Sequence, residues 1–321
     1  MYKAFYEELN APGSYYSPIE TRWSYIKADH AKQDFVIHNV KGHLLQKVTN
    51  FIMNLRTTAH AFYFSRHGQS EYNNLGRIGG DSGLSNHGLA YAKKLAEFVE
   101  TDIVRDSEGN EVPARLWTSS MRRTKETAQF INHRKIIVKP DPSDPSQDYE
   151  WLQMRPRAWH HLDELFAGAC DGMTYEEIEQ QFPEEWERRK SDKLAYRYPR
   201  GESYFDVIAR LEPIIIEMER HQEPLLIVAH QGILRIIYAF YMGLSRAEAP
   251  YVSIKLNCVT ELIPAVYGCV EKVHVLYKPE KCLAYDGQNE DHGDASASGR
   301  KEKETAAEKD ARQRSDDPPS H

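Results

Sequence analysis

The feature that most constrains this fold is an alternation of short strand-like runs with amphipathic helical patterns. In residues 225–229, LLIVA, every side chain is apolar, and a helical pattern starts just after His230. Strands of this composition are buried on both faces, as in parallel sheets that are covered by helices. Strand-like runs at 61–65 and 115–118 are likewise followed by helical patterns. We therefore expect a three-layer α/β/α fold with a mostly parallel central sheet and helices on both faces.

The helical patterns carry recognisable end signals. Ser85 or Asn86 is expected to cap one helix, and Thr174 and Glu177 have the spacing of a capping box. Pro213 is expected to bend its helix or to divide its register. The expected helices lie within 85–100, 121–131, 174–182, 202–220 and 233–243, and a further one lies within 43–55.

The two ends of the chain differ from its centre. Of the 321 residues, 40% are hydrophobic, which is enough for a substantial core. Residues 286–321 contain no Ile, Leu, Val, Met, Phe, Trp, Tyr or Cys, so burial cannot offset the entropy cost of ordering them. We expect a helical extension over 1–60, one α/β domain over 61–282 and a disordered charged tail over 283–321.

Charge and cysteine pattern narrow the class of ligand. The net charge of -7 argues against nucleic acid and acidic membranes as partners, so a small anion bound by a local basic cluster is expected. The four cysteines form no CxxC pair, and we expect no metal and no cofactor. No run approaches the roughly 20 apolar residues that span a bilayer, and the N-terminus has no signal-peptide pattern. We therefore expect a soluble, cytoplasmic protein.

Polar residues follow each of the three strand-like runs. His67, Ser119 and His230 come just after these runs, and the carboxyl ends of parallel strands meet at the sheet edge where ligands bind. Arg66 and Arg123 accompany them, and Arg123 falls in the first turn of its helix, where free amides and the helix dipole favour an anion. Because the arginine fork binds two phosphate oxygens at once, the sequence predicts a phosphate site.

Such a cluster suits attack by an imidazole nitrogen on phosphorus. Neighbouring guanidinium charge disfavours the imidazolium form, which would keep His67 neutral and nucleophilic. A phosphohistidine would form, and the leaving alkoxide would then need a proton from a carboxylic acid. Glu164, in the segment HLDELFAGACDG, is the first candidate for this acid and Asp163 the second, because spacing alone does not choose between them.

Three segments, in this order, resemble the signature of the histidine phosphatase superfamily. They are Arg66-His67-Gly68, the TSxxxRT pattern from Thr118 to Thr124, and His230 after its apolar run. Within this superfamily the chain is most similar to the fructose-2,6-bisphosphatases, through the segments GRIGGDSGLS, MTYEEI, YRYPRGESY, RLEPII and PAVYGC. The resemblance covers roughly residues 60–278.

This resemblance implies hydrolysis of the 2-phosphate of fructose 2,6-bisphosphate through a phosphohistidine, a reaction that regulates glycolysis and gluconeogenesis. It implies that His67 is phosphorylated and that Glu164 protonates the 2-oxygen of fructose. The residues implied around the 2-phosphate are Arg66, Asn73, Arg123 and His230, with Gly79 in a loop over the site. Those implied for the sugar and its 6-phosphate are Tyr175, Arg189, Lys193, Tyr204, Gln231 and Arg235. Helical spacing supports the second set, because Arg235 follows Gln231 by four residues and Lys193 follows Arg189 by four.

Other interpretations stay open at this point. Phosphoglycerate mutases share the RHG loop but resemble an ERHYG segment after their proton donor, where this chain has DELFAGACDG. An inactive module that senses a sugar phosphate is the alternative from another class, and the presence of both histidines with both arginines speaks against it. Arg189 and Lys193 could instead belong to a solvated charged face, and Tyr175 and Tyr204 could be partly structural.

The sequence also departs from the family pattern. Gln69 stands where a glutamate usually follows RHG, and Phe166 stands where a carboxylate is common. A carboxylate there would favour the protonated form of a neighbouring acid, so turnover is expected to differ from that of relatives. Residues 1–60 resemble only the end of a kinase domain, and because no GxxxxGK[ST] pattern occurs, no kinase activity is expected from this chain. A kinase half or a second copy of the chain remains open as a partner.

Overall fold

A six-stranded sheet forms the centre of this fold. The computed structural model describes residues 23–29, 34–54, 60–140, 143–265 and 268–278. The strand order is β10 (Gly268–Val275), β9 (Cys258–Ala265), β3 (Phe62–Arg66), β8 (Leu225–Ala229), β4 (Arg115–Ser119) and β7 (Pro156–Trp159). Strands β3, β8, β4 and β7 are parallel, whereas β9 is antiparallel to both β3 and β10. The expected mostly parallel sheet is confirmed.

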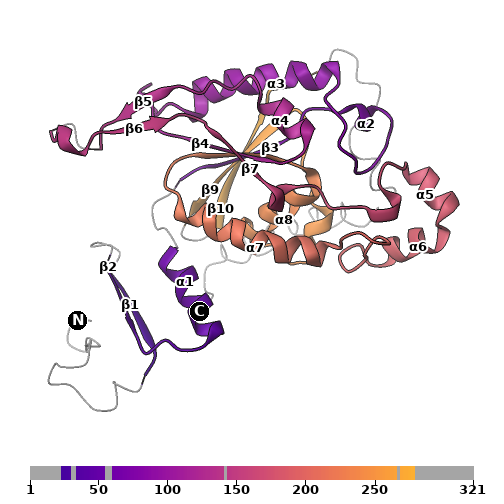
Figure 1. Cartoon of the computed structure of the whole chain (residues 1–321), viewed down its shortest axis with the longest axis horizontal. Coiled ribbons are helices and arrows are strands. Elements are labelled where there is room, and N and C mark those ends of the chain that lie inside the picture. The colour runs from indigo at the N-terminus through magenta and orange to yellow at the C-terminus, as the bar shows by residue number, and fades with distance from the viewer. Residues whose placement is uncertain (1–22, 30–33, 55–59, 141–142, 266–267, 279–321) are drawn as a thin grey trace, which may run out of the picture. The chain divides into compact units, whose positions relative to one another are not determined.

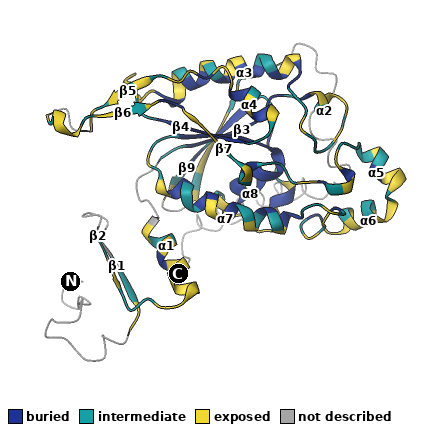
Figure 2. Cartoon of the chain, in the orientation of Figure 1, coloured by how far each residue is buried: buried dark blue, intermediate teal, exposed yellow. Residues whose placement is uncertain are grey.

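The sheet separates two hydrophobic cores. Leu225 and Ile227 of β8 pack on one side with α7 (Tyr204–Arg220) and α8 (Gln231–Tyr241). Leu226 and Val228 point to the other side and pack with α3 (Asn86–Phe98) and α4 (Arg122–Ala128). Figure 1 shows these helices on opposite faces of the sheet, and Figure 2 shows the buried strands between them. The all-apolar run of β8 is therefore explained by burial on both faces, which gives the expected three layers.

The expected helix signals have definite outcomes. Ser85, not Asn86, caps α3, because its side chain accepts a hydrogen bond from the Gly88 amide. Thr174 and Glu177 form the capping box of α5 (Tyr175–Gln181), as expected. Helix α7 runs without interruption through Pro213, so its register is not divided there. The remaining helices near the sheet's carboxyl edge are α2 (Glu71–Asn74) and α6 (Pro183–Ser191).

The N-terminal region contains more than the expected helix. Helix α1 (His43–Asn54) lies where predicted, and Lys47 on it pairs with Glu212 of α7 at 3.0 Å. Two antiparallel strands, β1 (Tyr25–Asp29) and β2 (Asp34–His38), precede it, so the expectation of a purely helical extension was incomplete. A second pair, β5 (Lys135–Val138) with β6 (Tyr149–Leu152), was also not predicted.

Two further expectations concern the C-terminal tail and the absence of a membrane-spanning segment. The tail over 283–321 lies outside the described residues. Among the helices of the described ranges, none combines the length and apolar character needed to cross a membrane. The domain boundaries near 60 and 282 remain predictions.

Candidate active site

His67 lies just after β3 at the carboxyl edge of the sheet. Its side chain is buried, and its backbone amide donates to the Ala229 carbonyl of β8 at 3.0 Å. The Nδ1 atom lies 2.8 Å from the Gly68 carbonyl, which can only accept, so Nδ1 carries the proton. The lone pair is thereby left on Nε2, which makes this nitrogen the nucleophilic atom of the ring.

Gly68 is needed for the position of this loop. A Cβ at residue 68 would lie 2.6 Å from the Gly88 carbonyl oxygen, closer than real Cβ contacts allow. A Cβ on Gly88 would in turn lie 2.2 Å from the Gln69 carbonyl oxygen. The loop and the first turn of α3 therefore pack backbone against backbone, which explains glycine at both positions.

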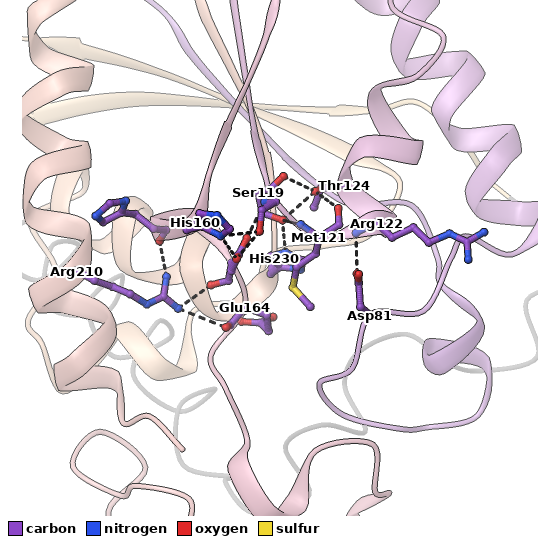
Figure 3. A network of polar contacts seen from close by, with 12 residues as sticks. Asp81, Ser119, Met121, Arg122, Thr124, His160, Glu164, Arg210 and His230 are labelled. Carbon is purple, nitrogen blue, oxygen red and sulfur yellow. Dashed lines mark hydrogen bonds and ion pairs between the residues drawn. The ribbon is translucent and has the colours of Figure 1, made fainter. Parts of the chain in front are cut away.

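His230 faces His67 across the edge of the sheet. Their ring centroids are 5.2 Å apart, and His230 is the N-cap residue of α8. Arg123 Nε donates to His230 Nδ1 at 3.2 Å, so the proton of this ring is on Nε2, which donates to Ser119 Oγ at 2.7 Å. Ser119 Oγ also lies 2.8 Å from the Thr124 hydroxyl (Figure 3). Because a guanidinium can only donate, Arg123 fixes the tautomer of the second histidine, and the buried hydroxyl pair accepts its Nε2 proton.

Both imidazoles are held in their neutral form. Burial, followed by the charges of Arg123 and Arg66, lowers the pKa of His67 well below its ordinary value. Burial, followed by the charge of Arg123, does the same to the pKa of His230. The sequence predicted neutrality from guanidinium charge, whereas burial is the larger cause. We call Arg66, His67, Arg123 and His230 the histidine cluster.

The start of α4 is already occupied by carboxylates of the chain itself. The Ser120 amide and hydroxyl donate to the two Asp163 oxygens at 2.6 Å each, and the Arg122 amide donates to Asp81 Oδ1 at 2.7 Å (Figure 3). The expectation that free amides here would favour a phosphate was therefore wrong for these two groups. Arg123 contributes instead through its buried side chain, whose Nη1 donates to the Gly80 carbonyl at 2.6 Å.

The two candidate acids have different surroundings. Asp163 is bound by Ser120 and also lies 3.2 Å from His160 Nδ1, so its carboxylate has a structural task. Within the described residues, the Glu164 carboxylate accepts a single hydrogen bond, a local one from the Leu165 amide to Oε1 at 2.9 Å. A Cβ on Gly232 would lie 2.6 Å from Glu164 Oε1, so this carboxylate rests against the first turn of α8, two residues beyond His230. The geometry favours Glu164 as the acid.

A second set of cations lies among tyrosines. Arg235 Nη1 donates to the Tyr204 hydroxyl at 3.4 Å, and both residues are buried. Arg189 Nη2 donates to the Tyr175 hydroxyl at 3.2 Å, and its guanidinium lies 4.9 Å from the centre of that ring. The Tyr204 hydroxyl also lies 3.8 Å from the Cβ position of Gly232, next to Glu164. The set is therefore connected to the proposed acid through Tyr204.

Lys193 belongs to this set through contacts that the sequence did not predict. Helix α6 ends at Ser191, so Lys193 does not share a helical face with Arg189, and that expectation was wrong. The buried Lys193 ammonium instead lies 4.9 Å from the centre of the Tyr251 ring. The next residue, Val252, accepts a hydrogen bond from Arg235 Nε. We call Arg189, Lys193 and Arg235, together with Tyr175, Tyr204 and Tyr251, the tyrosine-lined cluster.

The three remaining predicted residues have mixed surroundings. Asn73 Oδ1 accepts from the Ser70 amide and hydroxyl at 3.0 Å each, so this side chain helps cap α2. Gly79 has φ +66°, and a Cβ there would lie 1.7 Å from Asp171 Oδ1, so only glycine fits. Gln231 is buried as the first residue of α8. The contact of Ser119 with His230 was not predicted from the sequence, although Ser119 is part of the TSxxxRT pattern. The position of Asp171 against Gly79 was not predicted either.

Comparison with known proteins agrees with this geometry. The sequence profile described as histidine phosphatase superfamily (branch 1) matches residues 62–143 and 149–274. The chain is 39% identical over 268 residues to a fructose-2,6-bisphosphatase of Saccharomyces cerevisiae, covering 82% of this chain and 53% of that protein. It is also 39% identical over 268 residues to a 6-phosphofructo-2-kinase/fructose-2,6-bisphosphatase of Gallus gallus, covering 84% of this chain and 50% of that protein. The chain thus spans about half the length of these relatives.

Solved structures support the same fold. An alpha-ribazole phosphatase from Shigella flexneri superposes with a TM-score of 0.52 at 18% sequence identity. The superposition covers 69% of this chain and 100% of that one. At such low identity the likeness concerns the arrangement of helices and strands alone. In the described part of the chain, no group of three or more His, Cys, Asp or Glu side chains could hold a metal ion.

Proposed function

This chain belongs to the histidine phosphatase superfamily, and from that premise we propose that it hydrolyses the 2-phosphate of fructose 2,6-bisphosphate to fructose 6-phosphate and phosphate. The observation that carries the proposal is the buried His67, whose Nε2 carries the lone pair and whose pKa is lowered by burial and by the neighbouring charges of Arg123 and Arg66. The names of the Saccharomyces cerevisiae and Gallus gallus relatives supply the substrate class. The tyrosine-lined cluster supports a second anionic group on the same substrate.

In the first step, His67 Nε2 attacks the phosphorus of the 2-phosphate. The N–P bond forms while the bond from phosphorus to the fructose 2-oxygen breaks, and Glu164 gives its proton to that oxygen. Arg66 and Arg123 neutralise charge on the transferring phosphoryl group, as arginine forks do for phosphate oxygens. Fructose 6-phosphate leaves, and His67 carries the phosphoryl group.

In the second step, water attacks the phosphohistidine. Glu164, now ionised, takes the proton of the attacking water, and the N–P bond breaks to return neutral His67 and inorganic phosphate. The proton on His67 Nδ1 stays hydrogen-bonded to the Gly68 carbonyl through both steps, so the ring keeps its orientation. His230, with its tautomer fixed by Arg123, stands beside the phosphoryl group as a neutral partner.

The spacing of two backbone contacts supports a bisphosphate. Arg66 Nη1 donates to the Ile254 carbonyl at 3.1 Å, and Arg235 Nε donates to the Val252 carbonyl. These carbonyls lie two residues apart, which limits their separation to about 7 Å along the chain. One short segment thus connects an arginine of the histidine cluster with one of the tyrosine-lined cluster. Two anionic groups on one sugar suit this arrangement better than one.

The assignments for substrate contacts follow from the same proposal. The 2-phosphate is bound by Arg66, Asn73, Arg123 and His230 beneath the Gly79 loop, and the sugar and 6-phosphate by Tyr175, Arg189, Lys193, Tyr204, Gln231 and Arg235. We further propose that the protein acts in the cytoplasm, in the control of glycolysis and gluconeogenesis. A kinase half is proposed as its partner, because relatives such as the Gallus gallus protein carry both activities in their names.

The proposal is tested with fructose 2,6-bisphosphate labelled at the 2-phosphate. We expect a transient, acid-labile phosphoprotein and stoichiometric release of fructose 6-phosphate and labelled phosphate. Release of phosphate from position 6, or hydrolysis without any phosphoprotein, would contradict the proposed reaction. A labelled protein with the phosphate on a residue other than His67 would contradict the proposed nucleophile.

A further inference from the structure

The proposed acid, Glu164, lies on a segment without regular structure. Residues 163–167 are neither helix nor strand, so no ladder of backbone hydrogen bonds fixes them. A general acid must nevertheless be held within a fraction of an ångström of the oxygen that it protonates. Contacts from elsewhere in the chain must therefore position this segment.

Arg210 of α7 supplies most of these contacts. Its Nη2 donates to the Asp163 carbonyl at 2.6 Å and to the Glu164 carbonyl at 3.4 Å, and its Nη1 donates to the His161 carbonyl. Figure 3 shows the guanidinium reaching the backbone beside Glu164. One planar group thus binds the carbonyl of the acid itself and two carbonyls that precede it, which a lysine ammonium could not match in geometry.

Glu202 completes the grip from the other side. Its Oε1 accepts from Arg210 Nε at 2.9 Å, and its Oε2 accepts from Arg210 Nη2 at 3.2 Å and from the Phe166 amide at 3.0 Å. The Glu202 amide also donates to the Phe166 carbonyl at 2.9 Å. The backbone is therefore held on both sides of Glu164. Because Glu202 neutralises Arg210, the grip adds little net positive charge beside an acid that must keep its proton.

We propose that Arg210 and Glu202 form a positioning pair that aims the Glu164 carboxyl at the leaving-group oxygen. This inference rests on the proposed role of Glu164 as the acid. Both residues lie in segments singled out in the sequence, RLEPII and YRYPRGESY, but neither has a role in the mechanism so far. Within the described residues neither forms a hydrogen bond to the histidine cluster, and the charge of Arg210 is only the last of the causes that lower the pKa of His230, so the pair acts mainly through Glu164.

A positioning role has a signature that a merely structural role lacks. Misplacement of the Glu164 carboxyl should slow the reaction only of those substrates whose leaving oxygen needs a proton. Loss of the fold should slow the reaction of all substrates equally. Phenyl phosphate has a poor leaving group and 4-nitrophenyl phosphate a good one, so the pair of substrates separates the two cases. Neither substrate depends on the tyrosine-lined cluster or on fructose.

The experiment measures the rate of phosphoprotein formation for Arg210→Met, Arg210→Lys and Glu202→Gln with both aryl phosphates. For Arg210→Met, we expect a fall of about 10- to 100-fold with phenyl phosphate and less than about threefold with 4-nitrophenyl phosphate. Arg210→Lys and Glu202→Gln should show the same selectivity with smaller losses. Combining Arg210→Met with Glu164→Gln should add little to the loss from Glu164→Gln alone, because both remove the same step.

Arg115→Met is the matched control. Arg115 forms a similar two-pronged pair with Glu223, at 2.9 and 3.3 Å, and its side chain is 30% exposed against 19% for Arg210. It should leave the ratio of the two rates unchanged. Equal losses on both substrates in all three pair variants, or a double variant whose losses multiply, would overturn the positioning role. If Arg210→Met fails to fold, the lysine and glutamine variants decide.

The outcome is separable from the proposed function. A wild-type protein that ignores fructose 2,6-bisphosphate but forms phosphoprotein from phenyl phosphate would refute the proposed substrate while leaving this test intact. Conversely, normal turnover of fructose 2,6-bisphosphate by all three pair variants would refute the positioning role and leave the substrate in place.

Discussion

The two clusters of this site are built in different ways. The histidine cluster follows the ends of sheet strands, and His67 is fixed by the backbone of β8 and of its own loop. The tyrosine-lined cluster draws on α5, α6, α7, α8 and irregular segments, and it is held by hydroxyl groups and rings. We propose that the first cluster carries chemistry common to many phosphate esters, while the second selects one substrate.

The largest effect is expected from removing the nucleophile of the histidine cluster. His67→Ala should abolish the phosphoprotein and lower turnover by at least about 10⁴-fold on every substrate, because it removes the nucleophile. The fold should persist, since in the described part of the chain the lost ring forms a hydrogen bond only to its own loop. Phosphoprotein labelling and near-ultraviolet circular dichroism check both points. Labelling of wild-type intensity would move the nucleophile to another residue, with His230 the first to examine.

The next prediction distinguishes the roles of two neighbouring carboxylates, those of Glu164 and Asp163. Glu164→Gln should slow turnover of the natural substrate by about 10²- to 10⁴-fold with little change in stability, because it removes the proton donor. Asp163→Asn should mainly lower stability, by roughly 1–3 kcal/mol, since it weakens the bonds to Ser120 at the start of α4. Steady-state kinetics and urea unfolding of both variants measure the contrast. The reverse pattern would make Asp163 the acid.

The tyrosine-lined cluster should show a smaller, substrate-dependent effect. Replacing Arg189, Lys193 or Arg235 by Gln or Met should lower kcat/KM for fructose 2,6-bisphosphate by about 10- to 100-fold, because each removes a charge-assisted contact to the remote phosphate. Turnover of a small aryl phosphate should stay near wild type. Arg188→Gln is the matched control, because this neighbour of Arg189 is 71% exposed and, within the described residues, forms a salt bridge only with Glu185.

These measurements belong at fixed ionic strength, because exposed charges also steer anions from a distance. An equal loss on both substrates would mean that the tyrosine-lined cluster shapes the common phosphate site or the fold. Unchanged kinetics on both would make these cations structural and remove the main support for a bisphosphate.

The two clusters were also unequally predictable from sequence. The strand-like runs placed His67 and His230 correctly, because strand composition is a local pattern and parallel strands end at a common edge. Lys193 was misplaced because a helix end depends on capping contacts that a four-residue spacing does not reveal. Asp81 at the start of α4 was missed for a related reason. Its partner, the Arg122 amide, is 41 residues away, and no local pattern encodes such a contact.

The same reasoning applies to the sheet and to the choice of acid. Strands β9 and β10 were not predicted, and their residues are unevenly buried, whereas every residue of β8 is buried. Glu164 and Asp163 are adjacent in sequence, so only their tertiary partners could distinguish them. Ser120 holds the Asp163 carboxylate, and Gly232 makes room for that of Glu164.

The smallest expected effect concerns the stability of the histidine cluster at low pH. Burial lowers the pKa values of His67 and His230 well below the ordinary value of about 6.5 that they should have in the unfolded chain. As the pH falls through 6.5, the unfolded chain binds protons at these residues that the folded protein does not. Stability is therefore fully present above this pH and falls below it, by up to about 1.4 kcal/mol per pH unit for each histidine.

Urea unfolding of the wild type, His67→Ala and His230→Ala at pH 7.5, 6.5 and 5.5 measures this slope, in buffers without phosphate because a bound anion would stabilise the native state. Each variant should lose less stability than the wild type between pH 6.5 and 5.5, with a difference of about 1 kcal/mol. His221, whose pKa is lowered by burial and by Arg115, contributes to all three proteins and cancels in the comparison. Equal slopes would mean that both imidazoles accept protons in the folded state. The Nε2 lone pair of His67 would then be blocked near pH 6, and the neutral nucleophile on which the histidine cluster depends would be lost.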